Sequence, residues 1–387
     1  MKTNATVFSQ LLDFFPVYEF NKCVKRYHGN RGVQSFTCYD QFLAMTFAQL
    51  TYRESLRDVE TCFGAVQKKL YHSGLRGRVT KSTLADANES RNCEIYADFG
   101  RVMIERARRL YAGEEFGANL KATAYARDST TIDLCLELFP WARFRRTKAA
   151  VKMHTVIDLR GNIPSFIWIT DGKVHDVNFL DELEPEAGAF YIMDRAYNDF
   201  ERLYRFEKAR AFFVVRQKSD MVFRKVSYRP VDKSKGLKSD WTIRLKGNKT
   251  KKSYPTELRR VSYYDRENKH ILVFLTNNFR LAPATIAKLY KCRWQVELFF
   301  KWIKQNLRIK AFLGHSVNAV KTQIWIAISV YCLVSIVRQE LLVKRNISEI
   351  LQILSVTIFE QTPIKQVFAS VSQKFPEMDL SNHATLF

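Results

Sequence analysis

The chain has 387 residues, 47% of them hydrophobic, and carries a formal net charge of +23 with a pI near 9.7. This composition excludes a disordered or low-complexity protein, and the length predicts two or three domains. So strong a positive charge predicts a polyanionic partner, most often nucleic acid and less often an anionic membrane surface.

The seven cysteines are scattered and form no Cys-x-x-Cys pair. An odd number without a spacing pattern fits neither a disulfide framework nor a zinc ribbon, so we expect reduced thiols in a cytoplasmic protein. Residues 1–15 lack the long apolar run of a signal peptide. The longest apolar run, residues 324–337, is shorter than the ~18 residues of a membrane span. It predicts a buried helix, and we expect no membrane association.

Residues 1–118 are predicted to be helical, because apolar residues recur there at helical spacing. Ser55 is a candidate N-cap of a short helix, and a second short helix is expected over 65–71. Thr80 or Ser82 is a candidate N-cap of a third helix over 83–98. Short helices with a capped, polar third member are compatible with a helix-turn-helix, whose last helix enters a DNA major groove. They are equally compatible with an ordinary helical bundle.

From residue 119 the apolar period changes to that of strands. The chain then alternates strands with helices, and two of the strands form a hairpin joined by a Gly/Asn connection. The expected strands are 121–127, 152–158, 163–169, 190–193 and 212–215, and the expected helices are 176–183 and 199–210. This order predicts a mixed α/β core.

Residues 217–282 are predicted to be a β-rich insertion into that core. Its expected strands are 222–228, 241–245, 261–264 and 271–276. Between Arg216 and Arg260 the chain has fifteen Lys and Arg against four Asp and Glu. A solvated charged face usually mixes its signs, so this excess favours a surface that contacts a DNA backbone.

A helix over residues 290–304 is predicted next, because the segment has no Gly or Pro and two clear faces. Its apolar arc comprises Leu289, Cys292, Val296, Phe299, Phe300, Ile303 and Leu307. A narrower polar arc comprises Tyr290, Arg293, Glu297 and Lys304. Glu297 is the only acidic residue between Glu267 and Glu340. A lone carboxylate among cations is often just an ion-paired surface residue. Further helices are expected over 318–343 and 347–372.

Two aspartates are candidate partners for Glu297. Asp128 and Asp194 each follow a predicted strand, and ligand sites of open α/β sheets lie beyond the carboxyl ends of strands. An aspartate in that position is often only a turn or cap residue. Together, however, three carboxylates from three elements can hold two divalent cations through oxygen ligands. Two such ions activate a nucleophile and stabilise a leaving oxygen in phosphoryl transfer.

The sequence resembles the DDE transposases of bacterial insertion sequences, in the large family (number four) defined by the pattern Tyr-x2-Arg-x3-Glu-x6-Lys. Tyr290, Arg293, Glu297 and Lys304 fit that spacing without a gap. Asp128-Ser-Thr and Asp194-Arg-Ala-Tyr fit the first and second motifs of the family. The basic β-rich insertion before the glutamate fits as well, so the resemblance covers about residues 120–310.

The resemblance implies an RNase H-like mixed-sheet catalytic core. The implied domains are a helical DNA-end-binding domain (1–118), the core (119–216 and 283–312), the insertion (217–282) and a C-terminal helical segment (313–387). Flanking helical segments match the family by layout only.

By matching motif, Asp128, Asp194 and Glu297 become the catalytic and metal-binding triad, with two Mg²⁺ ions per active site that Mn²⁺ can replace. Arg293 and Lys304 would grip DNA phosphates, with support from Tyr290. The implied partner is double-stranded DNA, both terminal inverted repeats and target. The implied reaction is cleavage at the element ends and joining of the 3′-OH ends to the target (cut-and-paste), by a homodimer in the cytoplasm, associated with the nucleoid.

Two other readings of the sequence remain open. The first is a catalytically inactive DNA-binding or inhibitory relative, which the intact carboxylates argue against. The second is a structure-specific RNase H-like nuclease that cuts DNA but never joins it.

Some conspicuous residues receive no role from the sequence. Trp241 is the obvious aromatic of the insertion, but no motif connects it with DNA. His154 and His175 are expected to be packed or surface residues rather than ligands. A second basic cluster either touches DNA or faces solvent; it comprises Arg143, Arg145, Arg146, Lys148 and Lys152.

Overall fold

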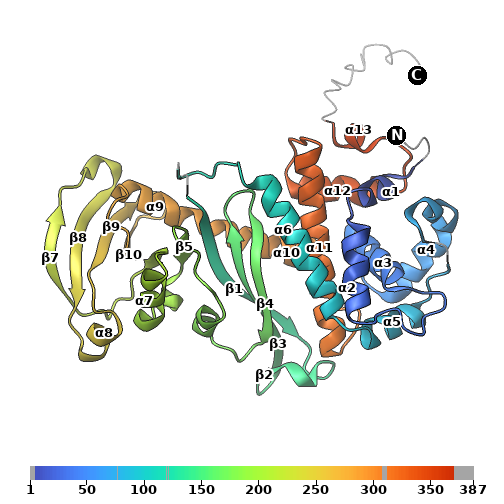
Figure 1. The fold of residues 1–387 in the computed structure, drawn as a ribbon, viewed down its shortest axis with the longest axis horizontal. Helices are drawn as coiled ribbons and strands as arrows, with labels where there is room; N and C mark the ends of the chain where they lie inside the picture. Colours follow the sequence, from blue (N-terminus) through green and yellow to red (C-terminus); the bar gives the residue numbers. More distant parts are fainter. Residues whose placement is uncertain (1–4, 76, 119, 121, 307–311, 370–387) are drawn as a thin grey trace, which may run out of the picture.

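The computed structural model describes the chain except residues 1–4, 76, 119, 121, 307–311 and 370–387. Figure 1 shows an elongated molecule with three parts in a row. The strands β7–β10 lie at one end, a bundle of helices lies at the other, and the strands β1–β5 lie between them.

The helices from both ends of the chain form one body. They are α1 (Val7–Leu12), α2 (Val17–Arg26), α3 (Cys38–Leu50), α4 (Leu56–Leu70), α5 (Lys81–Ser90), α6 (Glu94–Tyr111), α11 (Val317–Glu340), α12 (Ile347–Thr357) and α13 (Ile364–Phe368). The backbone N–H of Val7 donates to the Glu360 carbonyl at 2.8 Å, which ties the two ends together. The segments that the sequence suggested as separate thus share a single core.

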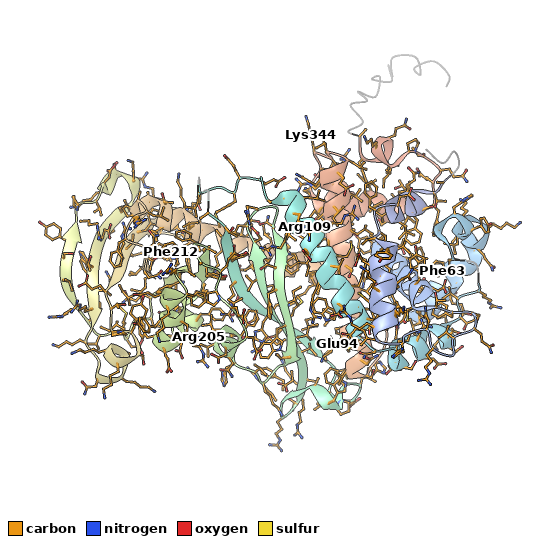
Figure 2. All side chains as sticks on the ribbon, in the orientation of Figure 1. Phe63, Glu94, Arg109, Arg205, Phe212 and Lys344 are labelled. Atoms are coloured by element: carbon orange, nitrogen blue, oxygen red, sulfur yellow. The ribbon has the colours of Figure 1, made fainter. Side chains whose placement is uncertain are left out.

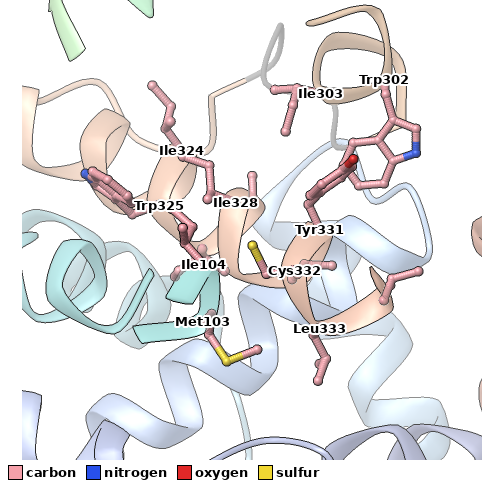
Figure 3. Close-up of a cluster of buried hydrophobic side chains, with 14 of the residues drawn as sticks. Met103, Ile104, Trp302, Ile303, Ile324, Trp325, Ile328, Tyr331, Cys332 and Leu333 are labelled. Carbon is pink, nitrogen blue, oxygen red and sulfur yellow. The ribbon is translucent and has the colours of Figure 1, made fainter. Parts of the chain in front are cut away.

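Helix α11 is the centre of this body. It has 24 residues and is apolar enough to cross a membrane by length and composition, but 94% of its most apolar window is buried inside the protein. Figure 3 shows Trp325, Ile328 and Cys332 of α11 packed beside Met103 and Ile104 of α6. The expectation of a buried helix is therefore confirmed.

The N-terminal helices begin where expected but divide differently. Ser55 and Thr80 are N-caps, since each side chain accepts a hydrogen bond from the backbone N–H three residues on. The segment after Ser55 is one helix, α4, rather than two short ones. The helix predicted over 83–98 is wrong, because the chain breaks between α5 and α6. There Asn318 donates to the Arg91 carbonyl at 2.6 Å, which satisfies a group at the end of α5.

The expected mixed α/β fold is confirmed by a single ten-stranded sheet with the order β2-β3-β1-β5-β6-β10-β9-β8-β7, in which β4 pairs with β3. Its core strands are β1 (Ala124–Leu134), β2 (Arg143–Arg145), β3 (Lys148–Asp158), β4 (Ile163–Asp171), β5 (Phe190–Met193) and β6 (Phe212–Arg216). Strand β3 is antiparallel to β1 and β4, whereas β1, β5 and β6 are parallel. This mixed pairing is compatible with the RNase H-like core that the resemblance implies. Helix α7 (Phe200–Lys208) links β5 to β6.

The hairpin between β3 and β4 turns where the Gly/Asn connection predicts. Gly161 and Asn162 have positive φ angles of 71° and 57°. A Cβ atom on Gly161 would lie 2.1 Å from the Tyr111 ring, so only glycine fits against α6 at this point.

The four strands expected in the insertion are present, and they extend the core sheet. They are β7 (Phe223–Arg229), β8 (Leu237–Leu245), β9 (Leu258–Asp265) and β10 (His270–Thr276). Strand β10 pairs with β6, so the insertion continues the core sheet without interruption. A short helix, α8 (Asn248–Ser253), lies between β8 and β9.

Candidate active site

Asp128 and Asp194 lie at the same level on neighbouring strands. Strands β1 and β5 are parallel, with Ala126 opposite Ile192, and each aspartate is two residues further on. Asp194 directly follows β5, as predicted. The prediction that Asp128 ends a strand is wrong, because β1 continues to Leu134 through its pairing with β3. Asp128 therefore has a more rigid backbone than a loop residue.

The helix predicted over 290–304 is two helices that meet at Arg293. They are α9 (Pro283–Cys292) and α10 (Trp294–Asn306). At the junction the Arg293 N–H donates to the Tyr290 carbonyl at 3.1 Å, three residues back, in place of the usual fourth. Most of the apolar arc is buried, namely Leu289, Val296, Phe299, Phe300 and Ile303. Leu307 lies outside the described residues, and Cys292 is only partly buried.

The polar arc of these helices faces the two aspartates. The Tyr290 hydroxyl donates to Asp194 Oδ1 at 3.1 Å. The Arg293 guanidinium donates to Asp128 Oδ2 at 3.1 Å and to Glu297 Oε1 at 2.5 Å. The structure thus joins all three predicted carboxylates to this helix pair, with Arg293 between two of them.

Lys304 completes the arc two turns beyond Glu297. Its Nζ donates to the Thr131 carbonyl of β1 at 2.7 Å. In this structure Lys304 therefore connects α10 to β1, the strand that carries Asp128.

The electrostatics of the site favour cations. Burial raises the pKa of Asp128 to about 6, and the charges of Glu297 and Asp194 act in the same direction. The Ser129 N–H and the Arg293 guanidinium oppose this rise. Burial, followed by the nearby charge of Asp194, raises the pKa of Tyr290 to about 12, so its hydroxyl stays protonated and can donate.

The carboxylates suit a hard divalent cation by chemistry, since such ions prefer carboxylate oxygens. Within the part of the chain that the structure describes, no three His, Cys, Asp or Glu residues are close enough to hold a metal ion. The positive charge between Asp128 and Glu297 comes from Arg293. In this structure the Arg293 guanidinium therefore neutralises these two carboxylates.

A second layer of polar residues, which the sequence did not reveal, supports Asp128 from the other face of β1. Ser129 Oγ donates to Asp176 Oδ1 at 2.6 Å, and Lys152 Nζ lies 3.1 Å from the same oxygen. Burial raises the pKa of Asp176, but these hydrogen bonds outweigh it and the net shift is downward. No spacing signal marks such a group, because the pairing of β1 with β3 and the packing of the 3₁₀ turn at 176–181 bring residues 129, 152 and 176 together.

The two histidines lie as expected. His154 is fully buried, and burial lowers its pKa to about 4, so it is neutral at physiological pH. Its ring packs against Trp168 and Phe179. His175 is exposed.

A cavity of about 500 Å³ opens beside Asp194. It is lined by Asp194, Arg195, Ala196, Lys218, Ser219 and Asp220. The cavity lies where the core meets the insertion, and its lining has two basic side chains and two acidic ones.

Comparison with known families gives two matches. Residues 120–333 match the family described as a transposase DDE domain, and residues 3–76 match a domain of unknown function.

Three curated bacterial proteins named as transposases are similar to the chain. One from Sinorhizobium fredii is 36% identical over 260 residues, covering 65% of this chain and 70% of the relative. One for the element IS5377 of Geobacillus stearothermophilus is 33% identical, covering 53% and 54%. One for the element IS4SA of Synechocystis is 25% identical, covering 83% and 88%. Among solved structures, a piggyBac transposase synaptic complex with hairpin DNA matches at 10% identity and a TM-score of 0.46, covering 98% of this chain and 85% of that one.

Proposed function

The chain belongs to the transposase DDE domain family, and from this premise we propose that it is a cut-and-paste transposase of an insertion sequence. It binds the terminal inverted repeats of its element, cleaves the DNA at the element ends and joins the 3′-OH ends to target DNA. The observation that supports this best is the level placement of Asp128 and Asp194 on parallel strands. Glu297 of α10 is linked to Asp128 through Arg293, which donates to both carboxylates.

Members of this family generally use divalent metal ions. In this chain Asp128, Asp194 and Glu297 would hold them, and we propose two Mg²⁺ ions, which Mn²⁺ can replace. The metal supplies Lewis-acid stabilisation of charge on the phosphate and its oxygens. Tyr290 orients the Asp194 carboxylate through its hydrogen bond, and the rigid pairing of β1 fixes Asp128.

Cations of this chain would hold the DNA. We propose that Arg293 exchanges its carboxylate partners for a phosphate near the element end, and that Lys304 contacts the neighbouring backbone. The basic insertion would provide sequence-independent affinity. We also propose the limits given above, with the N-terminal and C-terminal helical segments packed as one body. We further propose a homodimer when two ends are paired, and a cytoplasmic location at the nucleoid.

The full chain, incubated with DNA that carries the element's inverted repeats, tests the proposal. We expect Mg²⁺-dependent cuts at the element ends, followed by strand-transfer products. Cutting without joined products would indicate a nuclease. Binding without cleavage in Mg²⁺ or Mn²⁺ would indicate an inactive relative.

Replacing Arg293 with Gln is expected to tighten Mn²⁺ binding in the absence of DNA, because the guanidinium no longer neutralises Asp128 and Glu297. One lost ion-pair interaction of up to about 1 kcal/mol corresponds to up to about fivefold in affinity. Electron paramagnetic resonance of free Mn²⁺ measures this directly. The matched control is Arg195→Gln, an exposed arginine next to Asp194. Unchanged or weaker Mn²⁺ binding in Arg293→Gln would show that the guanidinium does not stand in for a cation.

Replacing Lys249, Lys251 and Lys252 of α8 with Gln is expected to weaken DNA binding across sequences. The slope of log K against log[salt] should flatten by up to about 0.9 for each lost phosphate contact. Fluorescence anisotropy over a salt series measures the slope. If the slope stays the same, α8 does not touch the backbone.

A further inference from the structure

The turn between β2 and β3 carries a concentrated positive charge that the catalytic site does not use. Residues 138–148 contain four basic residues and no acidic one: Arg143, Arg145, Arg146 and Lys148. All four are exposed. Within the described part of the chain, none of the four takes part in an ion pair. Figure 2 shows nitrogen-tipped side chains projecting from the β2 end of the molecule.

Aromatic residues next to this turn hold it in place. The Trp141 indole N–H donates to the His315 carbonyl at 2.7 Å, and the Phe139 ring lies edge-on to the His315 ring. Phe144 covers Gly172 so closely that a Cβ atom there would lie 2.8 Å from the ring. The charges are therefore presented on a fixed support, which lowers the entropic cost of binding.

The strand register places this charge relative to the active site. Thr155 of β3 is paired with Asp128, and Lys148 is seven residues further along the strand. At about 3.3 Å per residue, Lys148 lies about 23 Å along the strand from Thr155, the residue paired with Asp128. Seen from Asp128, the turn lies toward the carboxyl end of β1. Asp194, which follows β5, lies at the same end of the sheet. DNA rises about 3.4 Å per base pair, so this distance is about seven base pairs.

We propose that Arg143, Arg145, Arg146 and Lys148 form a second DNA-binding site, the β2–β3 site, which contacts the duplex backbone within about seven base pairs of the scissile phosphate. The position of the scissile phosphate rests on the proposed function. The chemistry rests on the site itself, because guanidinium groups without acidic partners match phosphate oxygens.

Binding of the full chain to duplexes that span an element end tests the β2–β3 site. Measurements in Ca²⁺ or without metal make the result independent of cleavage. The variant Arg145→Gln/Arg146→Gln should flatten the slope of log K against log[salt] by up to about 1.8, at about 0.9 per contact. The matched control, Lys344→Gln/Lys365→Gln, removes the same charge from exposed positions in the C-terminal helical region. Circular dichroism checks that each variant is folded.

Duplexes shortened on one side of the cleavage point identify which DNA is contacted. The difference between variant and wild type should vanish once the contacted side is shorter than about seven base pairs. If it vanishes on the element side, the site grips the terminal repeat; if on the other side, it grips flanking or target DNA.

The proposal is overturned if Arg145→Gln/Arg146→Gln has the same slope of log K against log[salt] as wild type on every long duplex. It is also overturned if the control variant flattens the slope by the same amount. A flattened slope in a protein that never cleaves DNA would support the site while contradicting the proposed function. The two failures are therefore distinguishable.

Discussion

Replacing Asp194 with Asn, or Glu297 with Gln, is expected to reduce Mg²⁺-dependent cleavage at element ends by on the order of 10³-fold, because each change removes a carboxylate that would hold a metal ion worth several kcal/mol of transition-state stabilisation. Asn at 194 keeps an oxygen that can accept the Tyr290 hydrogen bond, so the local structure should persist. Cleavage of a labelled duplex under single-turnover conditions measures the effect.

The same two variants should bind element-end DNA at least as well as wild type, because they remove negative charge near the DNA. Glu184→Gln is the matched control, since it removes an exposed carboxylate from the loop before β5. If Asp194→Asn cleaves at the control's rate, the triad is wrong. If it loses DNA binding as well, its carboxylate is structural rather than catalytic.

Replacing Asp240 with Ala is expected to lower the free energy of unfolding by about 3–5 kcal/mol, because it leaves a buried arginine without its counter-charge. Arg259 donates to both Asp240 oxygens, at 2.9 and 2.7 Å. The two side chains are only 2% and 1% exposed. Chemical denaturation followed by circular dichroism measures the change, and hydrogen exchange of β8 and β9 locates it.

Two further variants isolate the cause of this loss. Asp232→Ala removes an exposed carboxylate from the same insertion and should cost little. A double change, Arg259→Met with Asp240→Leu, should recover most of the stability, because two apolar groups replace the buried pair. A single Asp240→Ala change as mild as Asp232→Ala would mean that Arg259 finds other partners.

The Asp240–Arg259 pair also connects the insertion to the active site. Arg259 donates to the carbonyls of Asn278 and Leu281, in the loop that leads into α9. That helix carries Tyr290, which bonds Asp194. Loss of the pair should therefore disturb the catalytic residues as well as the insertion.

Much of the fold could be predicted from local patterns. The strands of the core and insertion follow runs of alternating or apolar residues, and the caps at Ser55 and Thr80 follow side-chain chemistry within four residues. The break at Arg293 could not be predicted, because no Gly, Pro or capping residue lies within residues 290–297. Helix α9 ends just before Arg293, and both α9 and the following helix α10 pack against the sheet. Tertiary contacts therefore override local propensity.

The sequence by itself determined which carboxylates to consider, because Asp194 follows an apolar strand and Glu297 stands alone on a helix face at family spacing. Only the tertiary structure decided that Asp128 lies inside a strand and that Arg293 lies between two carboxylates. It also decided that helices from both chain ends share one core. The physical reason is that register and packing depend on pairings between residues far apart in the chain, which no local pattern of hydrophobicity, charge or turn residues specifies.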